Sequence, residues 1–272
     1  MWIALATGAA FSNALWTSLS KPVVQHIPPL RMMMLFRLMQ VTIFLIPILI
    51  LRELPAAPIF WLTIAAIGTL HAARWVIILH GVKRDYFSSY GMYNTAPLFT
   101  LVLAPAMLPE RFGLSVWLGV LFIIAGGMVF YRTSHLSLYG LAGAVLTAFI
   151  NILSKRALGY VSPIALLFFM QASAAVVLVI TYLLTGRREA IPPRWGEELR
   201  RIAPLALIAC LAGICFMEAL ALDTATRVTA IVRTNLLFGL IFSYVLLREK
   251  ADWQWKLVGT VLILGGTVAV AM

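Results

Sequence analysis

The chain is poor in charged residues, and acidic residues are especially scarce. Lys, Arg, Asp and Glu make up 11% of its 272 residues, whereas soluble domains use about 25% to cover their surface. Only 10 Asp and Glu stand against 21 Lys and Arg, which gives a formal net charge of +11. A basic excess can indicate nucleic-acid binding, but here the basic residues lie mostly in short gaps between apolar blocks, where they set membrane topology. The composition therefore excludes an ordinary soluble domain and predicts no nucleic-acid partner.

Cysteine and histidine are also rare, which argues against metal and catalytic centres. Cys210 and Cys215 lie in one apolar segment, make no metal-ligand pattern and are expected to be packing residues. The 4 His residues are scattered, with no HExxH motif and no paired carboxylates. We therefore predict no cofactor, no metal and no enzymatic activity. The first apolar block starts at Met1 with no basic region before it, so no cleavable signal peptide is expected.

Long apolar blocks are what the sequence has in abundance. Hydrophobic residues make up 62% of the chain, and most blocks are about 17 to 22 residues long, enough for a helix to cross a hydrocarbon core of roughly 30 Å. They do not alternate apolar and polar residues as barrel strands do. The predicted fold class is an all-α integral membrane protein of about ten transmembrane helices. The expected spans are 2–19, 32–51, 59–81, 87–108, 113–131, 138–153, 163–185, 202–222, 228–247 and 254–272.

An internal repeat divides the chain into two halves. The fourth span ends in Leu-Pro-Glu-Arg at 108–111 and the ninth in Leu-Arg-Glu-Lys at 247–250. Each motif is followed, at the same spacing, by a glycine pair, 126–127 and 265–266, that is expected to pack against another helix. Residues 1–134 and 135–272 are therefore predicted to be two copies of one five-helix unit. An odd number of spans inverts the second copy, as in secondary transporters that bind substrate between their repeats.

These motifs resemble those of the drug/metabolite transporter superfamily, in particular its EamA-type members. The resemblance covers nearly the whole chain and implies alternating access through a central cavity. It also implies substrates that range from amino acids to sugar conjugates and drugs, and export in many members. The residues that carry it are Ala96-Pro97, Leu108 to Arg111, Gly119 and Gly126-Gly127 in the first copy, and Asn235, Glu249-Lys250, Gly259 and Gly265-Gly266 in the second. The second copy departs from the first at Leu236, which stands where the first has Pro97.

Polar residues inside the spans are the candidate substrate-binding residues, because each is costly in lipid. In the fourth span Tyr90, Tyr93 and Asn94 share a helical face, which either lines a cavity or packs against a neighbouring helix. In the third span Arg74 lies too deep to reach water easily, so it is expected to be paired or to face a water-filled cavity. The full candidate set is Asn13, Trp16, His71, Arg74, Trp75, Tyr90, Tyr93, Asn94, Asn151, Glu218 and Arg233.

The charges within the spans suggest two kinds of substrate. Arg37, Arg74 and Arg233 stand against a single acid, Glu218. Guanidinium groups bind carboxylate and phosphate well, so the leading hypothesis is export of an amino acid, an organic acid or another anionic or zwitterionic metabolite. Glu218 then either carries a coupling proton or forms a buried ion pair with Arg74 or Arg233. The rival hypothesis is a proton-coupled multidrug or organic cation exporter, which the tyrosines of the fourth span would favour through cation–π contacts.

Charge in the loops and the duplication bear on topology and assembly. Loops after odd-numbered spans hold far more Lys and Arg than loops after even-numbered spans, which places both termini outside, whereas the usual family arrangement has both in the cytoplasm. We expect a multi-pass protein of a bacterial inner membrane that works as a monomer. Its expected partners are a small-molecule substrate, lipid, and either protons or a counter-substrate. A membrane-embedded enzyme and a non-transporting scaffold are the remaining alternatives.

Overall fold

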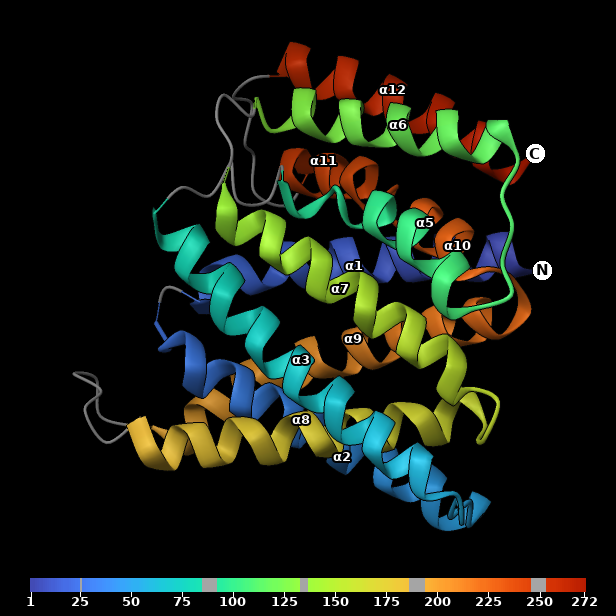
Figure 1. Cartoon of the computed structure of the whole chain (residues 1–272). Coiled ribbons are helices and arrows are strands. Elements are labelled where there is room, and N and C mark those ends of the chain that lie inside the picture. The colour runs from blue at the N-terminus through green and yellow to red at the C-terminus, as the bar shows by residue number, and fades with distance from the viewer. Residues whose placement is uncertain (25, 85–91, 133–136, 186–193, 246–252) are drawn as a thin grey trace.

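The computed structural model describes residues 1–24, 26–84, 92–132, 137–185, 194–245 and 253–272, and its regular elements in these ranges are all helices (Figure 1). They are α1 Trp2–Val24, α2 Pro29–Leu51, α3 Pro58–Arg84, α5 Ala96–Met107, α6 Leu114–Phe130, α7 Leu138–Ala157, α8 Pro163–Thr185, α9 Trp195–Leu222, α10 Ala225–Val232, α11 Asn235–Val245 and α12 Trp253–Ala271. By length and composition 7 of the described spans can cross a membrane, and α5 and α6 are shorter apolar helices. The predicted all-helical membrane fold is confirmed.

Proline and hydroxyl residues mark where several helices begin. Pro29, Pro58 and Pro163 each occupy the first residue of a helix, where a backbone N–H has no intrahelical partner. Ser137 caps α7 by accepting the Gly140 N–H at 3.4 Å. These signals place the boundaries within a few residues of those expected, except that α9 begins at 195, seven residues earlier than predicted.

Two predicted spans are not continuous helices. The ninth span is divided into α10 and α11, with Arg233 and Thr234 between them. In the fourth span α5 begins only at Ala96, after a turn at Asn94 and Thr95, and residues 85–91 lie outside the described ranges. The expectation of one uninterrupted helix at each place is therefore wrong.

The two copies interleave. The most extensive helix contacts join α1 to α9, α3 to α7, α2 to α8 and α6 to α12, and each of these pairs takes one helix from either copy. Both chain termini lie at one end of the bundle, called here the terminal end, and the other is called the opposite end (Figure 1). Neither copy forms a body of its own, so every packing layer depends on both.

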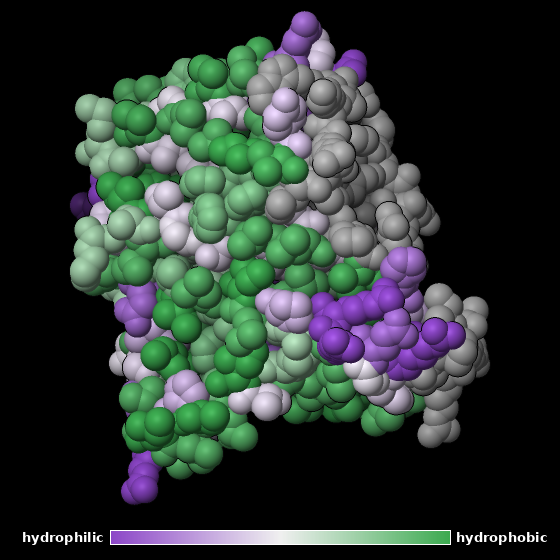
Figure 2. All heavy atoms as spheres, turned by 180° about the vertical axis from the view of Figure 1, so that it is seen from behind, coloured by the Kyte–Doolittle hydropathy of each residue, from purple (hydrophilic) through white to green (hydrophobic). Residues whose placement is uncertain are grey.

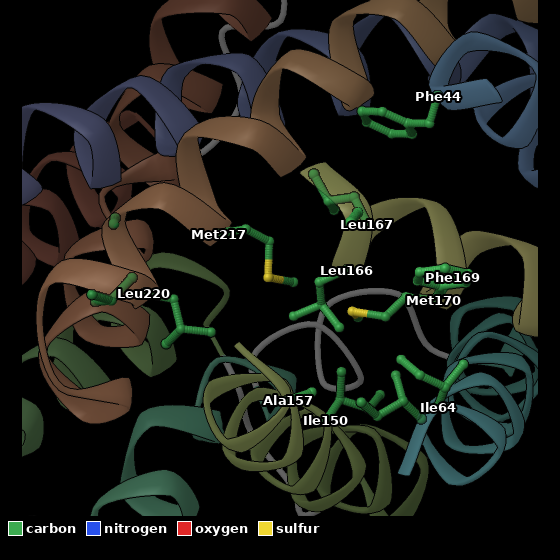
Figure 3. Close-up of a cluster of buried hydrophobic side chains, with 14 of the residues drawn as sticks. Phe44, Ile64, Ile150, Ala157, Leu166, Leu167, Phe169, Met170, Met217 and Leu220 are labelled. Carbon is green, nitrogen blue, oxygen red and sulfur yellow. The ribbon is translucent and has the colours of Figure 1, made fainter. Parts of the chain in front are cut away.

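A large apolar cluster shows this mixing (Figure 3). Phe44 and Ile64 of the first copy pack with Leu166, Met170 and Met217 of the second, and all five side chains are buried. Outside, hydrophobic residues cover most of the face in Figure 2, and hydrophilic residues gather mainly at its margins. An apolar outer surface of this extent suits contact with lipid tails.

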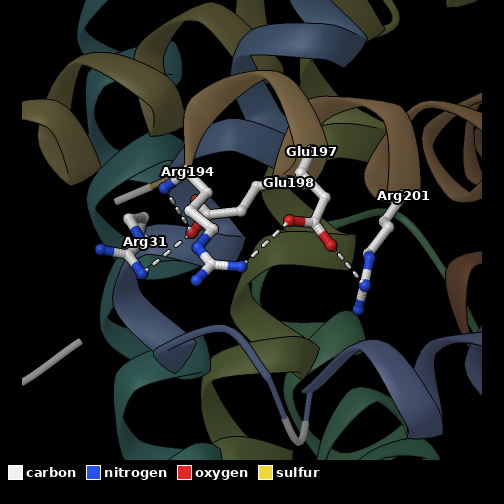
Figure 4. Close-up of polar contacts among 5 residues, drawn as sticks. All are labelled: Arg31, Arg194, Glu197, Glu198 and Arg201. Atoms are coloured by element: carbon white, nitrogen blue, oxygen red, sulfur yellow. Dashed lines mark hydrogen bonds and ion pairs between the residues drawn. The ribbon is translucent and has the colours of Figure 1, made fainter. Parts of the chain in front are cut away.

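The opposite end is fastened by an ion pair between the first turns of α2 and α9 (Figure 4). Arg31 Nη2 lies 3.0 Å from Glu198 Oε1, and neither side chain is more than 8% exposed. Glu198 Oε1 also accepts the Arg194 N–H at 3.3 Å. On the outer face of α9, Glu197 pairs with Arg201 at 2.5 Å. Copy one and copy two are thus joined electrostatically at this end.

Helices α6 and α12 run side by side at one edge of the bundle (Figure 1), with glycine at their contact points. A Cβ added at Gly126 would lie 2.6 Å from the Gly259 carbonyl oxygen, and one added at Gly266 would lie 2.5 Å from the Gly119 oxygen. Such backbone contact is possible only without side chains, and it associates helices in lipid where the hydrophobic effect cannot. The expected packing role is therefore confirmed for one glycine of each pair.

The register of this contact differs by one residue from the repeat alignment. Matching the glycine pairs by their distance from the fourth and ninth spans makes Gly127 the equivalent of Gly266. In the structure the equivalent of Gly266 is Gly126, while Gly127 faces Asn94 and Gly265 meets nothing within 4 Å. The copies therefore differ in length by one residue between the helix break and the last helix.

Gly126→Ala is expected to destabilise the protein by about 1–3 kcal/mol, because the added carbon would overlap the Gly259 carbonyl oxygen and Ile263. Gly265→Ala is the matched control, since a Cβ there meets nothing within 4 Å. Thermal unfolding in detergent should show a lower Tm for Gly126→Ala alone. Equal melting temperatures would contradict the close contact of α6 and α12.

Candidate functional site

The helix break in each copy has the same local chemistry. At the ninth span the Thr234 N–H donates to the Ile231 oxygen, only three residues back, at 2.9 Å, and the Thr234 hydroxyl donates to the same oxygen at 2.8 Å. In the fourth span the Thr95 N–H and hydroxyl donate to the Met92 oxygen at 3.0 and 2.6 Å. A tightened turn inside a helix is a frequent hinge. Both breaks therefore contain the same kind of tightened turn inside a predicted span.

Repeat-equivalent residues meet between the copies. Arg233 Nη1 donates to Oδ1 of Asn94, its equivalent in the first copy, at 3.4 Å. Arg37 Nη1 donates to Gln171 Oε1 at 2.5 Å, and these two residues stand at the same distance from the prolines that begin α2 and α8. Each pair consists of one guanidinium and one amide. The duplication thus places two arginines at the interface between the copies, one from each.

A histidine links two of the arginines. Arg37 Nη2 lies 3.3 Å from His71 Nδ1, and Arg74 Nη2 lies 3.2 Å from the same atom. A guanidinium only donates, so Nδ1 must be the acceptor and carries no proton in this arrangement. Arg37 and Arg74 are 5% and 8% exposed. His71 therefore holds two buried cations close together.

The aromatic candidates lie beside the arginines. The guanidinium carbon of Arg74 is 5.2 Å from the Trp75 ring centroid, and that of Arg233 is 4.9 Å from the Tyr93 ring centroid. Trp75 in turn meets Trp16 edge to face at 6.2 Å. The ring faces that could attract a cation already have the protein's own arginines against them. Among the described residues, Trp75 Nε1 is a buried donor that has no hydrogen-bond partner.

The three arginines of this centre are Arg37, Arg74 and Arg233. In the part of the chain that the structure describes, no carboxylate pairs with any of the three. Their acceptors are neutral: Gln40 at 2.7 Å and Gln171 for Arg37, a histidine nitrogen, and Asn94. The Nε atoms of all three arginines are buried without a hydrogen bond to any described residue. A buried charge without a counter-charge is costly, so the centre is electrostatically suited to an anion.

Two candidate residues form no hydrogen bond or ion pair with the three arginines in the described ranges. Glu218 is half-buried on α9, about 12 Å or two turns along the helix from Cys210, which interacts with Arg37. Within the described ranges it pairs with neither Arg74 nor Arg233, so the ion pair considered from the sequence is not found. Asn151 is buried and donates to the Thr229 hydroxyl at 3.0 Å, a contact between α7 and α10.

The structure thus gathers most of the candidate set in one place. The residues that lie together are His71, Arg74, Trp75, Tyr93, Asn94 and Arg233. Trp16 contacts Trp75, and its Nε1 donates a hydrogen bond to Asn13 Oδ1 at 3.1 Å. Tyr90 lies outside the described residues. Sequence reasoning left out Gln40 and Gln171, and it placed Arg37 within a span without including it in the set. The repeat position that Gln171 shares with Arg37 was the signal that could have found it.

Comparison with known proteins follows the same division of the chain. Residues 1–132 and 136–272 each match the model of the EamA-like transporter family. No curated protein matches the sequence. Among solved structures, one described as "Crystal structure of protein" is 17% identical, with 98% of each chain covered and a TM-score of 0.75. At that identity the likeness concerns the fold alone.

Gln171→Leu is expected to destabilise the protein by about 1–3 kcal/mol, because it removes an acceptor from the buried Arg37 guanidinium. Gln171→Glu is the matched variant, since it keeps an acceptor in place and adds a counter-charge. Thermal unfolding should therefore give a lowered Tm for leucine and an unchanged or raised Tm for glutamate. A leucine variant as stable as the parent would mean that the Arg37–Gln171 contact carries no stability.

Proposed function

The chain belongs to the EamA-like transporter family, and from that premise we propose that it is a secondary transporter for a small anionic or zwitterionic metabolite. Membership makes it a multi-pass membrane transporter of the drug/metabolite superfamily. The substrate class, an amino acid, an organic acid or a similar solute, is proposed from the site. Export is the proposed direction, because the superfamily includes many exporters.

The observation that carries the proposal is the buried cluster of three arginines, which no carboxylate of the described residues pairs with. A planar guanidinium binds a carboxylate or a phosphate with two parallel hydrogen bonds. Arg74 makes one hydrogen bond, to His71, among the described residues, so it retains donors for a ligand. An anion at this centre would supply a counter-charge that the described part of the chain does not provide there.

The helix breaks support the same substrate charge. Helices α5 and α11 both begin at the breaks, so their N-terminal ends lie in the middle of the bundle. A helix N-terminus carries a partial positive charge. Transporters with broken helices use such ends to bind anionic substrate groups. The hinges at Thr95 and Thr234 would also let the half-helices move, which alternating access requires.

The alternative, export of an organic cation, has less support. A cation would have to approach three guanidinium groups, and the faces of Tyr93 and Trp75 already lie against two of them. Glu218, the acid such a mechanism would use, pairs with neither Arg74 nor Arg233 among the described residues. Thermal-shift hits confined to organic cations, and lost in Glu218→Gln, would nevertheless favour this alternative over the anion proposal.

The proposal includes assembly and orientation. One chain supplies both copies, 1–134 and 135–272, so a monomer is proposed as the working unit. In the sequence the loops after odd-numbered spans are the more basic, which would place both termini outside. Protons or a counter-substrate are the proposed driving solutes, and a bacterial inner membrane is the proposed location.

Carboxylates or phosphorylated metabolites are expected to raise the Tm of the purified protein. A ligand at a concentration 100-fold above its Kd adds about 2.7 kcal/mol of stability to the state that binds it. Arg74→Ala and Arg233→Ala should lose this rise, because each removes a guanidinium from the buried cluster. Arg201→Ala should keep it, since Arg201 is an exposed arginine paired with Glu197 on the outer face of α9. A rise that survives both cluster variants would contradict the proposed site.

Counterflow of the labelled hit into proteoliposomes separates transport from binding alone. A transporter should exchange labelled solute against unlabelled solute trapped inside. A non-transporting scaffold would bind the solute and show no exchange.

A further inference from the structure

The loop between α5 and α6 reaches across to the other copy through Glu110. Glu110 belongs to the Leu-Pro-Glu-Arg motif at 108–111, to which the proposed substrate site gives no role. Its Oε1 accepts the backbone N–H of Ala225, the first residue of α10, at 2.9 Å. Glu110 is 8% exposed. A side chain of the first copy therefore closes the N-terminus of a half-helix of the second.

The neighbourhood of Glu110 joins three more elements at the terminal end. Lys155, near the end of α7, donates to the backbone oxygens of Leu220 and Asp223, where α9 ends, at 2.5 and 2.8 Å. The Asp223 carboxylate lies 4.0 Å from Arg227 of α10. The charged groups around Glu110 are thus Lys155, Asp223 and, beyond it, Arg227.

These contacts bear directly on the movement of α10. The helix begins at Ala225, whose N–H donates to Glu110, and ends at the break beside Arg233, one of the three cluster arginines. Thr229, halfway along it, is held by Asn151 of α7. If the first turn of α10 moves away from the loop at 108–113, the Glu110 contact must open, because it joins that turn to the first copy.

The protonation of Glu110 is linked to this tie. Burial raises the pKa of Glu110 above the ordinary range of a glutamate, and Asp223 raises it further, while the Ala225 N–H and Lys155 lower it. A carboxyl group with a higher pKa when buried than when in water binds a proton on closing and releases it on opening. The neutral acid can still accept the Ala225 N–H through its carbonyl oxygen. Oε2 is buried beside the Thr226 N–H without a hydrogen bond of good geometry to any described residue.

We propose that Glu110 is a proton-binding site that controls opening of the terminal end. It is neutral while α10 is tied to the loop at 108–113, and it gives its proton to water when the two separate. Low pH therefore favours the closed terminal end, and high pH favours the open one. The inference rests on the proposed function only in that a transporter must open at both ends.

Cysteine labelling in detergent tests the proposal. The reporter is Thr229→Cys in a Cys210→Ser, Cys215→Ser background, because Thr229 is 3% exposed and lies one turn inside α10. Glu110→Gln mimics the neutral acid and should label more slowly than the Glu110 parent at about pH 8, by up to tenfold for each pKa unit that separates the two states. At about pH 5, closer to the ordinary pKa of a glutamate, the two rates should lie closer together, and comparison at each pH cancels the reactivity of the thiol itself.

Further variants separate loss of the Glu110–Ala225 contact from unfolding of the protein. Glu110→Ala removes the acceptor for the Ala225 N–H and should label faster than the parent at both pH values. Glu197→Gln changes an exposed carboxylate at the opposite end and should leave the rates unchanged. Leu178→Cys, 1% exposed in α8, replaces the reporter to detect unfolding and should stay unlabelled in Glu110→Ala.

The proposal is overturned if the Glu110→Gln and parent rates keep one ratio at both pH values, or if Glu110→Ala labels no faster. Neither result touches the substrate site, which the thermal shift and its loss in Arg74→Ala test separately. Conversely, the labelling experiment needs no substrate, so it stands if the anion hypothesis fails.

Discussion

A guanidinium group keeps its charge even inside a protein, and this chain holds three of them between its two copies. The described residues surround Arg37, Arg74 and Arg233 with amides, a histidine nitrogen and aromatic faces, all of them neutral. Neutral acceptors satisfy donors but leave the positive potential in place. The structure tolerates that potential because side chains of both copies accept hydrogen bonds from the arginines.

The contacts between the two copies also bear on how the bundle can move. Helices α6 and α12 touch backbone to backbone at their glycines, so little relative motion is open to them without loss of packing. The breaks at Thr95 and Thr234 lack full α-helical hydrogen bonding. The contact at this edge is therefore tight, whereas the two breaks interrupt regular helical hydrogen bonding beside the arginines.

The sequence predicts the helices and the duplication because both depend on local pattern, namely the length of apolar blocks and recurring motifs. It does not predict the breaks, since Thr234 is compatible with a helix and turns only in its tertiary setting. Gln171 was overlooked because an amide among apolar residues stands out less than a charge. Glu218 was included because it is charged, although among the described residues it pairs with none of the three arginines. The register of Gly127 was misjudged because the glycine pairs were matched at the spacing of the Glu110 and Glu249 motifs, although Gly119 and Gly259, one position further apart, record the extra residue.

The two ends of the bundle are tied by different chemistry. At the opposite end the tie is an ion pair between Arg31 and Glu198, in which opening would separate two charges. At the terminal end Glu110 meets a backbone N–H, with Lys155 turned toward the end of α9. Burial raises the pKa of that carboxyl although the Ala225 N–H and Lys155 lower it, so protonation would remove the cost of burying its charge. Opening would thus separate an ion pair at one end and a carboxyl group from a backbone N–H at the other, and this difference would let one end loosen while the other holds, as alternating access requires.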